Sequence, residues 1–301
     1  MSTTVTGADT GESGPAPTKP GRARPRGQAS PGEKILRYSL MLIAVAVVIL
    51  PLLWQVSVSL KSPGEGVAGF PGSLVPESPT LDNYVKAFTS IPLPQYFLNS
   101  AIISSMSVVL NLVLATLAGY ALARIPFRGR GLYLVALLAT AALPFEVILV
   151  STLLVTRSLG LYDTLLGVVL PQAVSIISIF VMRQAFTKIP YELEEAATVD
   201  GSGPFRTFWS IMLPLVRNSL AVVVVLGFLE SWDQFVWPLV VLSDTSKYPV
   251  TVGVEFLSGA FSADQRVMAA AAILVLIPPL LVFFLLQKQV FKGVTGGAVK
   301  G

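Results

Sequence analysis

Six long apolar stretches occupy most of this chain. They cover about residues 38–60, 96–123, 132–154, 165–182, 220–242 and 267–286. A helix needs roughly 20 mostly apolar residues to cross about 30 Å of hydrocarbon. In lipid the backbone polar groups must be satisfied within the segment, which favours helices here. The sequence therefore predicts an all-α membrane protein with six transmembrane helices.

The composition agrees and excludes several functional classes. Of 301 residues, 53% are hydrophobic and 13% charged, against about 25% charged in soluble domains. The absence of cysteine and histidine excludes disulfide scaffolds, thiol catalysis, thiolate or imidazole metal sites and histidine-based triads. A net charge of only +4 without a compact basic patch argues against nucleic acid as a partner. No GxxxxGK[ST] phosphate loop occurs, so we expect no ATP hydrolysis, no catalytic residue, no cofactor and no metal in this chain.

The basic residues predict the orientation of the chain. Sixteen lie in the N-terminal segment, the second and fourth connections and the C-terminus, and five lie in the alternate loops. Lysine and arginine favour cytoplasmic segments. We therefore expect both termini in the cytoplasm, which agrees with an even number of spans.

Two domains are expected. Residues 1–34 are rich in Pro, Gly, Ser and Thr, which cannot bury enough surface to order a chain, so they are predicted to be a disordered cytoplasmic tail. Residues 35–301 form the membrane domain. It contains an extracytoplasmic loop at 61–95, with an amphipathic patch at 81–88, and a cytoplasmic loop at 184–216.

The cytoplasmic loop is predicted to hold two short helices. Pro190 suits a first helical turn, and the acids that follow it favour the positive end of a helix. Asp200 and Gly201 then provide turn residues that end this helix. Pro204 begins a second helix, over 205–212, before Pro214 leads into the fifth span. Such a hairpin is either an interfacial helix without a partner or a knob that docks on a cytoplasmic protein.

In the same loop Glu195-Ala196-Ala197 is followed after three residues by Gly201 and after nine more by Ile211-x-Leu213-Pro214. This pattern resembles the EAA motif of bacterial ABC-importer permeases of the carbohydrate-uptake family, the six-span, maltose type. Other segments are similar to the same family at 81–84, 97–100, 159–164, 232–239 and 293–301. The resemblance covers about residues 35–301.

That resemblance implies a type I ABC-importer permease in the bacterial inner membrane. Its coupling helix would dock on a cytoplasmic ATPase, with Glu195 as the main polar contact and Gly201 setting the bend. The docking residues carried over are Glu194, Glu195, Ala196, Ala197, Asp200, Gly201, Ile211, Leu213 and Pro214. The implied partners are a second homologous permease, two copies of an ATP-binding subunit holding ATP and Mg, an extracytoplasmic sugar-binding protein and membrane lipid.

Polar residues inside the predicted spans are candidates for a translocation path. Ionisable groups cost roughly 2.5–3.5 kcal/mol each in a span and usually face a cavity. Glu230, Asp233, Gln234 and Trp237 have helical spacing that places them on one face of the fifth span, and Trp232 lies beside them. Asn99 and Glu146 are further candidates. The alternative is a polar seam that holds this helix to its neighbours, and Asn99, Asn111, Glu146 and Gln172 favour such packing roles.

The sequence thus predicts a permease subunit of an ATP-driven, binding-protein-dependent importer of mono- or oligosaccharides. Three alternatives remain. One is a permease of the same type for a non-sugar solute such as a glycerol phosphate. Another is an ATP-independent carrier, although no internal repeat of the kind carriers show is evident. The third is a membrane enzyme that uses carboxylates such as Glu230 and Asp233.

Overall fold

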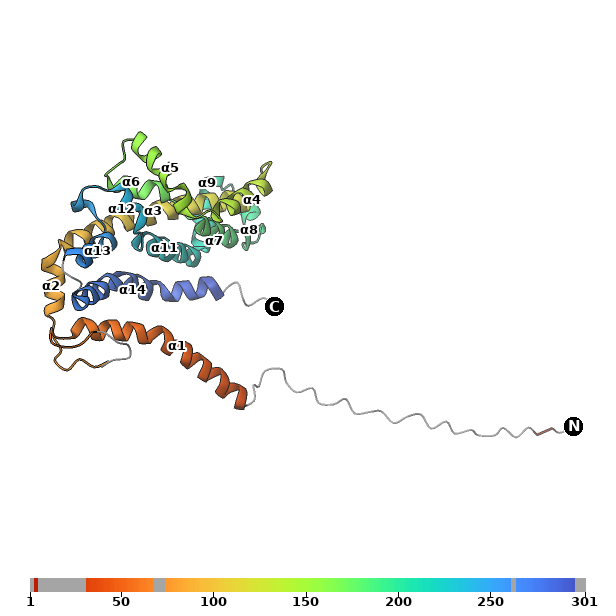
Figure 1. Ribbon diagram of the computed structural model, residues 1–301. Helices are drawn as coiled ribbons and strands as arrows, with labels where there is room; N and C mark the ends of the chain where they lie inside the picture. The colour runs from red at the N-terminus through yellow and green to blue at the C-terminus, as the bar shows by residue number, and fades with distance from the viewer. Residues whose placement is uncertain (1–2, 5–30, 68–73, 261–263, 296–301) are drawn as a thin grey trace. The chain divides into compact units, whose positions relative to one another are not determined.

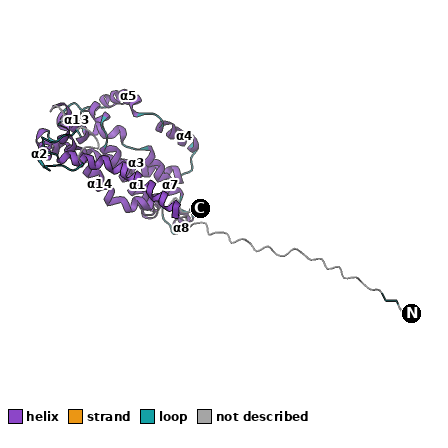
Figure 2. Ribbon diagram, turned by 60° about the horizontal axis from the view of Figure 1, so that its bottom comes forward, coloured by secondary structure: helices purple, strands orange, loops and turns teal. Residues whose placement is uncertain are grey.

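The computed structural model describes residues 3–4, 31–67, 74–260 and 264–295. Within these ranges the regular elements are all helices, as Figure 2 shows. The chain divides after Leu50 into two units, and each is described by itself. The predicted all-α class is confirmed for the described part of the chain.

The first unit holds the start of α1 (Pro31–Leu60). This helix is apolar on all sides, which is typical of a membrane span, and Pro51 lies inside it. Helix α1 begins at Pro31, so residues 31–34 of the predicted tail are helical. Residues 1–2 and 5–30 of that tail lie outside the described residues.

The second unit contains all the other helices (Figure 1). The segments predicted to span the membrane contain α3 (Leu93–Arg124), α4 (Arg130–Ala141), α5 (Phe145–Ser158), α6 (Leu165–Val169), the 3-10 turn η1 (Leu170–Gln172), α7 (Ile176–Thr187), α11 (Arg217–Trp232), α12 (Val236–Val241) and α14 (Gln265–Thr295). The segments between them contain α2 (Asp82–Ser90) and α13 (Val250–Ala260).

Three helices, α1, α3 and α14, are individually long and apolar enough to cross a membrane. The remaining candidates are bent pairs. α4 and α5 meet at 99°, the α6–η1 segment meets α7 at 49°, and residues Pro204–Leu215 meet α11 at 77°. The described residues thus hold three candidate spans that are single helices, or up to six candidate spans if each bent pair is one span.

The predicted fifth span is interrupted, which the hydropathy did not indicate. α11 ends at Trp232, residues 233–235 are not helical, and α12 begins at Val236. Sixteen residues rise only about 24 Å, less than the hydrocarbon thickness. Helix α11 alone is therefore shorter than a full crossing.

Helix α3 is the centre of the second unit and packs against both α7 and α11, while α11 also packs against α14. One core cluster includes Tyr96, Trp232 and Trp237, and another includes Met182 and Phe186. Large apolar side chains also cover the outside of the helices, such as Leu132, Val147, Ile177 and Leu285. Such an apolar exterior is typical of a membrane-embedded protein.

The predicted amphipathic patch in the first loop is a helix, α2. Its buried Asn83 donates hydrogen bonds to the carbonyls of Ser59 at 2.9 Å and Lys61 at 2.8 Å. These bonds hold α2 against the end of α1, because they satisfy carbonyls that have no partner within that helix.

Candidate functional site

The first predicted helix of the cytoplasmic loop is α8 (Glu192–Val199). It begins two residues after Pro190, so Pro190 precedes the helix and does not lie in its first turn. Three acids occupy the first turn, Glu192, Glu194 and Glu195, where the positive end of the helix dipole favours them.

Gly201 ends α8 in the way the sequence predicts. Its φ is +76°, a left-handed conformation that glycine adopts at little cost. The Ser202 amide donates to the Ala197 carbonyl at 2.9 Å, and the Gly201 amide donates to Thr198 at 3.0 Å. This pair of bonds is a Schellman motif. No heavy atom lies within 4 Å of a Cβ built on Gly201, so glycine is required for its backbone angle and not to avoid a neighbouring group.

The second predicted helix is present in a modified form. α9 (Pro204–Thr207) runs into a π-helical segment, η2 (Phe208–Met212), and then into α10 (Leu213–Leu215). The chain bends at Val216 before α11. π-Helical turns often mark functional sites, and this one lies between the loop and the fifth span.

The coupling-loop residues divide into an exposed and an inward-facing group. Ala197 is buried, and Ile211 and Leu213 are half-buried. Glu195, Ala196, Asp200 and Pro214 are exposed. Two large apolar side chains beside them are also exposed, Val199 by 87% and Phe205 by 84%. The loop therefore presents carboxylates and apolar groups together on its outer side.

Glu194 does not belong to that outer side. Its carboxylate Oε1 lies 3.1 Å from Nε of Arg124, at the end of α3, and its side chain is only 23% exposed. From the sequence, Arg124 is expected only to favour the cytoplasmic side of the membrane. The available signal was an arginine that directly ends a 32-residue, otherwise uncharged helix.

The predicted polar stripe on the fifth span is wrong as a continuous helix face, because the helix is interrupted before Gln234. Glu230 and Asp233 are both exposed near the end of α11. Gln234 lies in the break, and its amide donates to the Gln172 side chain of η1. Trp237 lies beyond the break and is 2% exposed. Of these four residues, only Glu230 and Asp233 are exposed.

Three prolines near this break leave carbonyls without their helical donor, since proline has no N–H to give to the residue four positions earlier. Each of these carbonyls has a side-chain donor instead. Pro171 frees the Gly167 carbonyl, which accepts from the Trp237 indole at 3.1 Å. The carbonyl freed by Pro279, that of Val275, accepts from the Trp232 indole at 3.2 Å.

The third carbonyl is that of Gln234, freed by Pro238, and it accepts from the Thr251 hydroxyl at 2.6 Å. Trp237 therefore joins α12 to α6, and Trp232 joins α11 to α14. Their contacts match the alternative of a seam between helices.

The other polar candidates within the predicted spans differ in their contacts: the two asparagines bond neighbouring elements, whereas Glu146 is exposed. The Asn99 amide donates to the carbonyls of Ser246 at 2.8 Å and Tyr248 at 3.0 Å, and Asn111 bonds Ser178 and the Ser175 amide. Both hold elements together. Glu146, in the first turn of α5, is exposed.

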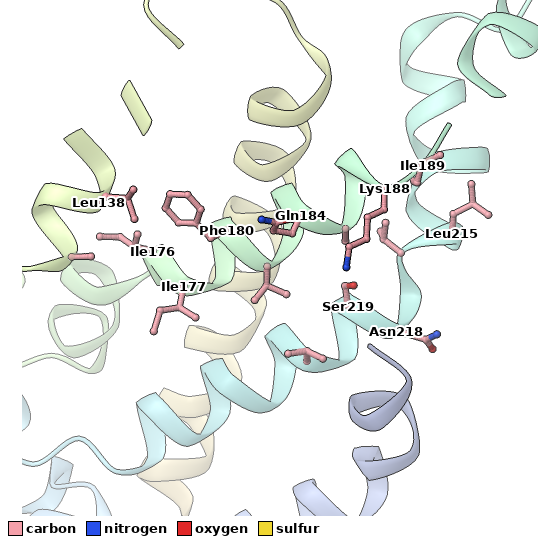
Figure 3. Close-up of a pocket in the computed structure, with 15 residues that line it drawn as sticks. Leu138, Ile176, Ile177, Phe180, Gln184, Lys188, Ile189, Leu215, Asn218 and Ser219 are labelled. Carbon is pink, nitrogen blue, oxygen red and sulfur yellow. The ribbon is translucent and has the colours of Figure 1, made fainter. Parts of the chain in front are cut away.

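An open cleft of about 690 Å³ lies between α4, α7 and the start of α11 (Figure 3). Its walls are mostly apolar, and its polar groups gather where α7 and α11 approach the coupling loop. There Lys188 extends from the end of α7 toward Ser219 of α11 (Figure 3). The cleft is thus walled by the helix that precedes the loop, α7, and the helix that follows it, α11.

A charged clasp joins two connections at the opposite end of α3. Asp163 has a φ of +57° and lies 2.7 Å from the ammonium of Lys247. Its carboxylate also accepts from the amides of Ser243 and Asp244, each at 3.0 Å. The Asp244 amide, followed by Lys247, lowers the pKa of Asp163 to about 2. Among the described residues no group of acids is arranged to hold a metal ion.

These features define a class, a multi-pass helical membrane protein with a helical loop that leaves acids and apolar side chains exposed. Residues 111–296 match the family described as the inner membrane component of binding-protein-dependent transport systems. The chain belongs to that family, which comprises ABC-importer permeases, and it is a transport protein and not an enzyme. The resemblance drawn from the EAA motif is confirmed.

Two named relatives illustrate the range of the family. The arabinooligosaccharides transport system permease AraQ of Halalkalibacterium halodurans is 35% identical over 227 residues, 75% of this chain and 81% of its own. The sn-glycerol-3-phosphate transport system permease UgpE of Yersinia pestis is 32% identical over 271 residues, 87% of this chain and 96% of its own.

A solved bacterial ABC transporter for alginate import contains a chain with the same fold. The match has a TM-score of 0.74 at 23% identity, and it covers 87% of this chain and 99% of that one. At this identity the likeness concerns the fold alone.

Proposed function

We propose that this chain is one of two permease subunits of an ATP-driven, binding-protein-dependent importer of mono- or oligosaccharides. Two copies of a cytoplasmic ATP-binding subunit, which hold the ATP and Mg, would supply the energy, and an extracytoplasmic binding protein would deliver the sugar. The observation that carries this proposal is the coupling loop. Its inner side is fixed to the membrane helices, whereas its outer side presents exposed acids and apolar groups.

The proposed topology has six spans with both termini in the cytoplasm. The sixteen-to-five distribution of basic residues supports it, as do three straight helices and the further bent segments. In this topology the fifth crossing combines α11 and α12. The loop at 184–216 and the cleft beside Lys188 then lie on the cytoplasmic side.

The docking surface combines Glu195, Ala196 and Asp200 with the apolar Val199 and Phe205. Carboxylates favour basic groups on the ATPase as charge-assisted bonds. An exposed Val199 and Phe205 would be covered by a groove in that partner, since exposed apolar groups of this size at a protein surface often mark interaction sites. Gly201 fixes the turn that joins the two parts of this surface.

The translocation path would run past the interrupted fifth span. Glu230 and Asp233 are exposed near the break, and carboxylates can bond sugar hydroxyls. The cleft between α7 and α11 would form the cytoplasmic part of the path. Its walls flank the coupling loop, which would allow closure of the ATPases to alter it.

A glycerol phosphate is the second candidate cargo, because the relative UgpE is named for sn-glycerol-3-phosphate transport. The charges near the break favour a neutral sugar. Two exposed acids, Glu230 and Asp233, would repel an anion, and a carboxylate–phosphate contact has no compensating charge. A panel of neutral sugars and sn-glycerol-3-phosphate, offered to the whole transporter in proteoliposomes, separates the two.

Charge reversal at the docking surface tests the proposal. Glu195→Lys should reduce co-purification of the ATP-binding subunit and abolish substrate-stimulated ATPase activity. The matched control is Glu77→Lys, which reverses an exposed acid at the other end of α3 and should leave both unchanged. Normal assembly with full stimulated activity in Glu195→Lys would contradict docking through this surface, and transport by the chain without any ATPase would favour a carrier.

The bend can be tested independently. Gly201→Leu places a side chain at a φ of +76°, which costs about 1–2 kcal/mol. The Phe205 side of the surface should then lose its position relative to α8, and ATPase co-purification should fall. The control is Gly203→Ala, which should leave co-purification unchanged. Gly203 has an extended backbone, and no heavy atom lies within 4 Å of a Cβ built on it.

A further inference from the structure

Arg124 connects three elements at the base of the coupling loop. It is the last residue of α3, and its side chain is only 2% exposed. Its Nη2 donates to the Phe186 carbonyl of α7 at 2.7 Å and to the Ile189 carbonyl just beyond α7. Its Nε meets Glu194 of α8 at 3.1 Å. The guanidinium also lies 4.3 Å from the ring centroid of Tyr191, the residue before α8.

These contacts use the properties that distinguish arginine from lysine. A buried charge must be paired, and the guanidinium of Arg124 has two carbonyls, a carboxylate and an aromatic face around it. Both carbonyls are bonded by Nη2 and lie at or just beyond the end of α7, where the negative end of the helix dipole favours a cation. Lysine has a compact ammonium on a differently shaped side chain, so it would not reproduce the planar contact with the Tyr191 ring together with the other contacts.

Helix α8 depends on such contacts. It has only eight residues, and no side chain caps its N-terminus. A helix this short is marginal by itself. Its inner side is held by burial of Ala197 and by the contacts of Arg124 with Tyr191 and Glu194.

We propose that Arg124 is the positioning residue that ties the coupling helix α8 to α3 and α7, so that displacement of α8 by a partner is transmitted into the membrane helices. This inference rests on the proposed docking of α8 on an ATPase for its functional consequence. The tether itself is a property of this chain alone. Glu194 accordingly faces inward and serves the tether, while Glu195 faces the partner.

A neighbouring arginine provides a matched control. Arg130 donates through Nη2 to the Ala123 carbonyl at 3.3 Å, so it also contacts the end of α3. The structure gives it no bond to α7 or α8. Arg124→Lys and Arg130→Lys therefore make the same chemical change six residues apart in the chain, and they differ in whether the side chain contacts α8.

The first experiment measures the tether without any partner. The sequence has no cysteine, so Leu117→Cys on α3 and Val199→Cys at the end of α8, both exposed, accept spin labels specifically. Double electron–electron resonance spectroscopy on the full-length chain in nanodiscs gives the distribution of distances between the two spin labels. Arg124→Lys and Glu194→Gln should broaden it and Arg130→Lys should not. An unchanged distribution in both tether variants overturns the proposal.

The second experiment measures transmission in the assembled transporter, without the spin-label substitutions. Arg124→Lys and Glu194→Gln should retain co-purifying ATPase, because the outer side of α8 is unaltered. Stimulation of the ATPase by the loaded binding protein should fall about tenfold, the ratio that corresponds to about 1.4 kcal/mol lost with one buried ion pair. Glu194→Gln, which keeps the shape of the side chain, guards against failure of Arg124→Lys to fold.

The outcomes separate the tether from the docking proposal. If the wild-type chain recovers no ATPase, docking fails, while the distance measurement still decides the tether. Full stimulation in both tether variants, with the ATPase bound, overturns transmission through Arg124.

Discussion

The tryptophan–carbonyl contacts lead to a sharp prediction about Trp237. This residue is 2% exposed, and its indole donates to the carbonyls of Gly167 at 3.1 Å and Val168 at 3.2 Å. These are the two carbonyls that an amide at position 171 would use in an α-helix and a 3-10 helix, respectively. Pro171 supplies no such amide. The indole thus replaces a backbone donor.

Trp237→Phe should therefore lower the free energy of unfolding by about 2–4 kcal/mol. A buried carbonyl left without a donor costs about 1–3 kcal/mol, and the smaller ring adds a packing loss of about 1 kcal/mol. The assay is denaturant titration in micelles, followed by the helical circular dichroism signal. Trp209→Phe is the control, because Trp209 is 61% exposed and should change the free energy by less than about 0.5 kcal/mol.

A double-mutant cycle isolates the hydrogen bond from the packing. Pro171→Ala restores an amide that can bond Gly167, so Trp237→Phe should cost about 1 kcal/mol less in that background. Independent sites add within about 0.3–0.5 kcal/mol. Additivity within that range would refute the reasoning that the indole substitutes for the missing proline donor.

Two further predictions concern packing and pH. Gly119→Ala should destabilise the chain, because its new Cβ would lie 2.6 Å from the Met182 Cβ and 2.8 Å from the Arg183 amide nitrogen of α7. Gly131→Ala on α4, where a Cβ meets no atom within 4 Å, should be neutral in the same titration. The Asp163 clasp should contribute stability above the ordinary pKa of 3.8 and lose it as the pH falls toward about 2, since the folded pKa is lowered. Melting temperatures over this range should fall more steeply for the wild-type chain than for Asp163→Asn, and equal slopes would count against the clasp.

Local features of the sequence were sufficient to predict much of the fold. Hydropathy located the six apolar segments, and turn chemistry located α8 and its end at Gly201, because both depend on residues close together in the chain. The EAA motif indicated the family for the same reason, since its spacing falls within one loop.

Hydropathy averaged over a span could not place the break at 233–235, because the apolar residues on both sides outweigh the few polar residues around it. It also could not assign Glu194 and Glu195 to opposite sides of α8, since both are acids in one helical turn.

Tertiary structure alone decided which distant groups complete the backbone and hold the loop. Trp237 meets the carbonyl freed by Pro171, Trp232 meets the one freed by Pro279, and Arg124 meets Phe186 and Glu194. These partners lie dozens of residues apart, so no periodicity connects them. Each pairing exists because a buried polar group in an apolar surrounding must find a partner from whichever helix packs beside it, and only the packing of the helices determines which one that is.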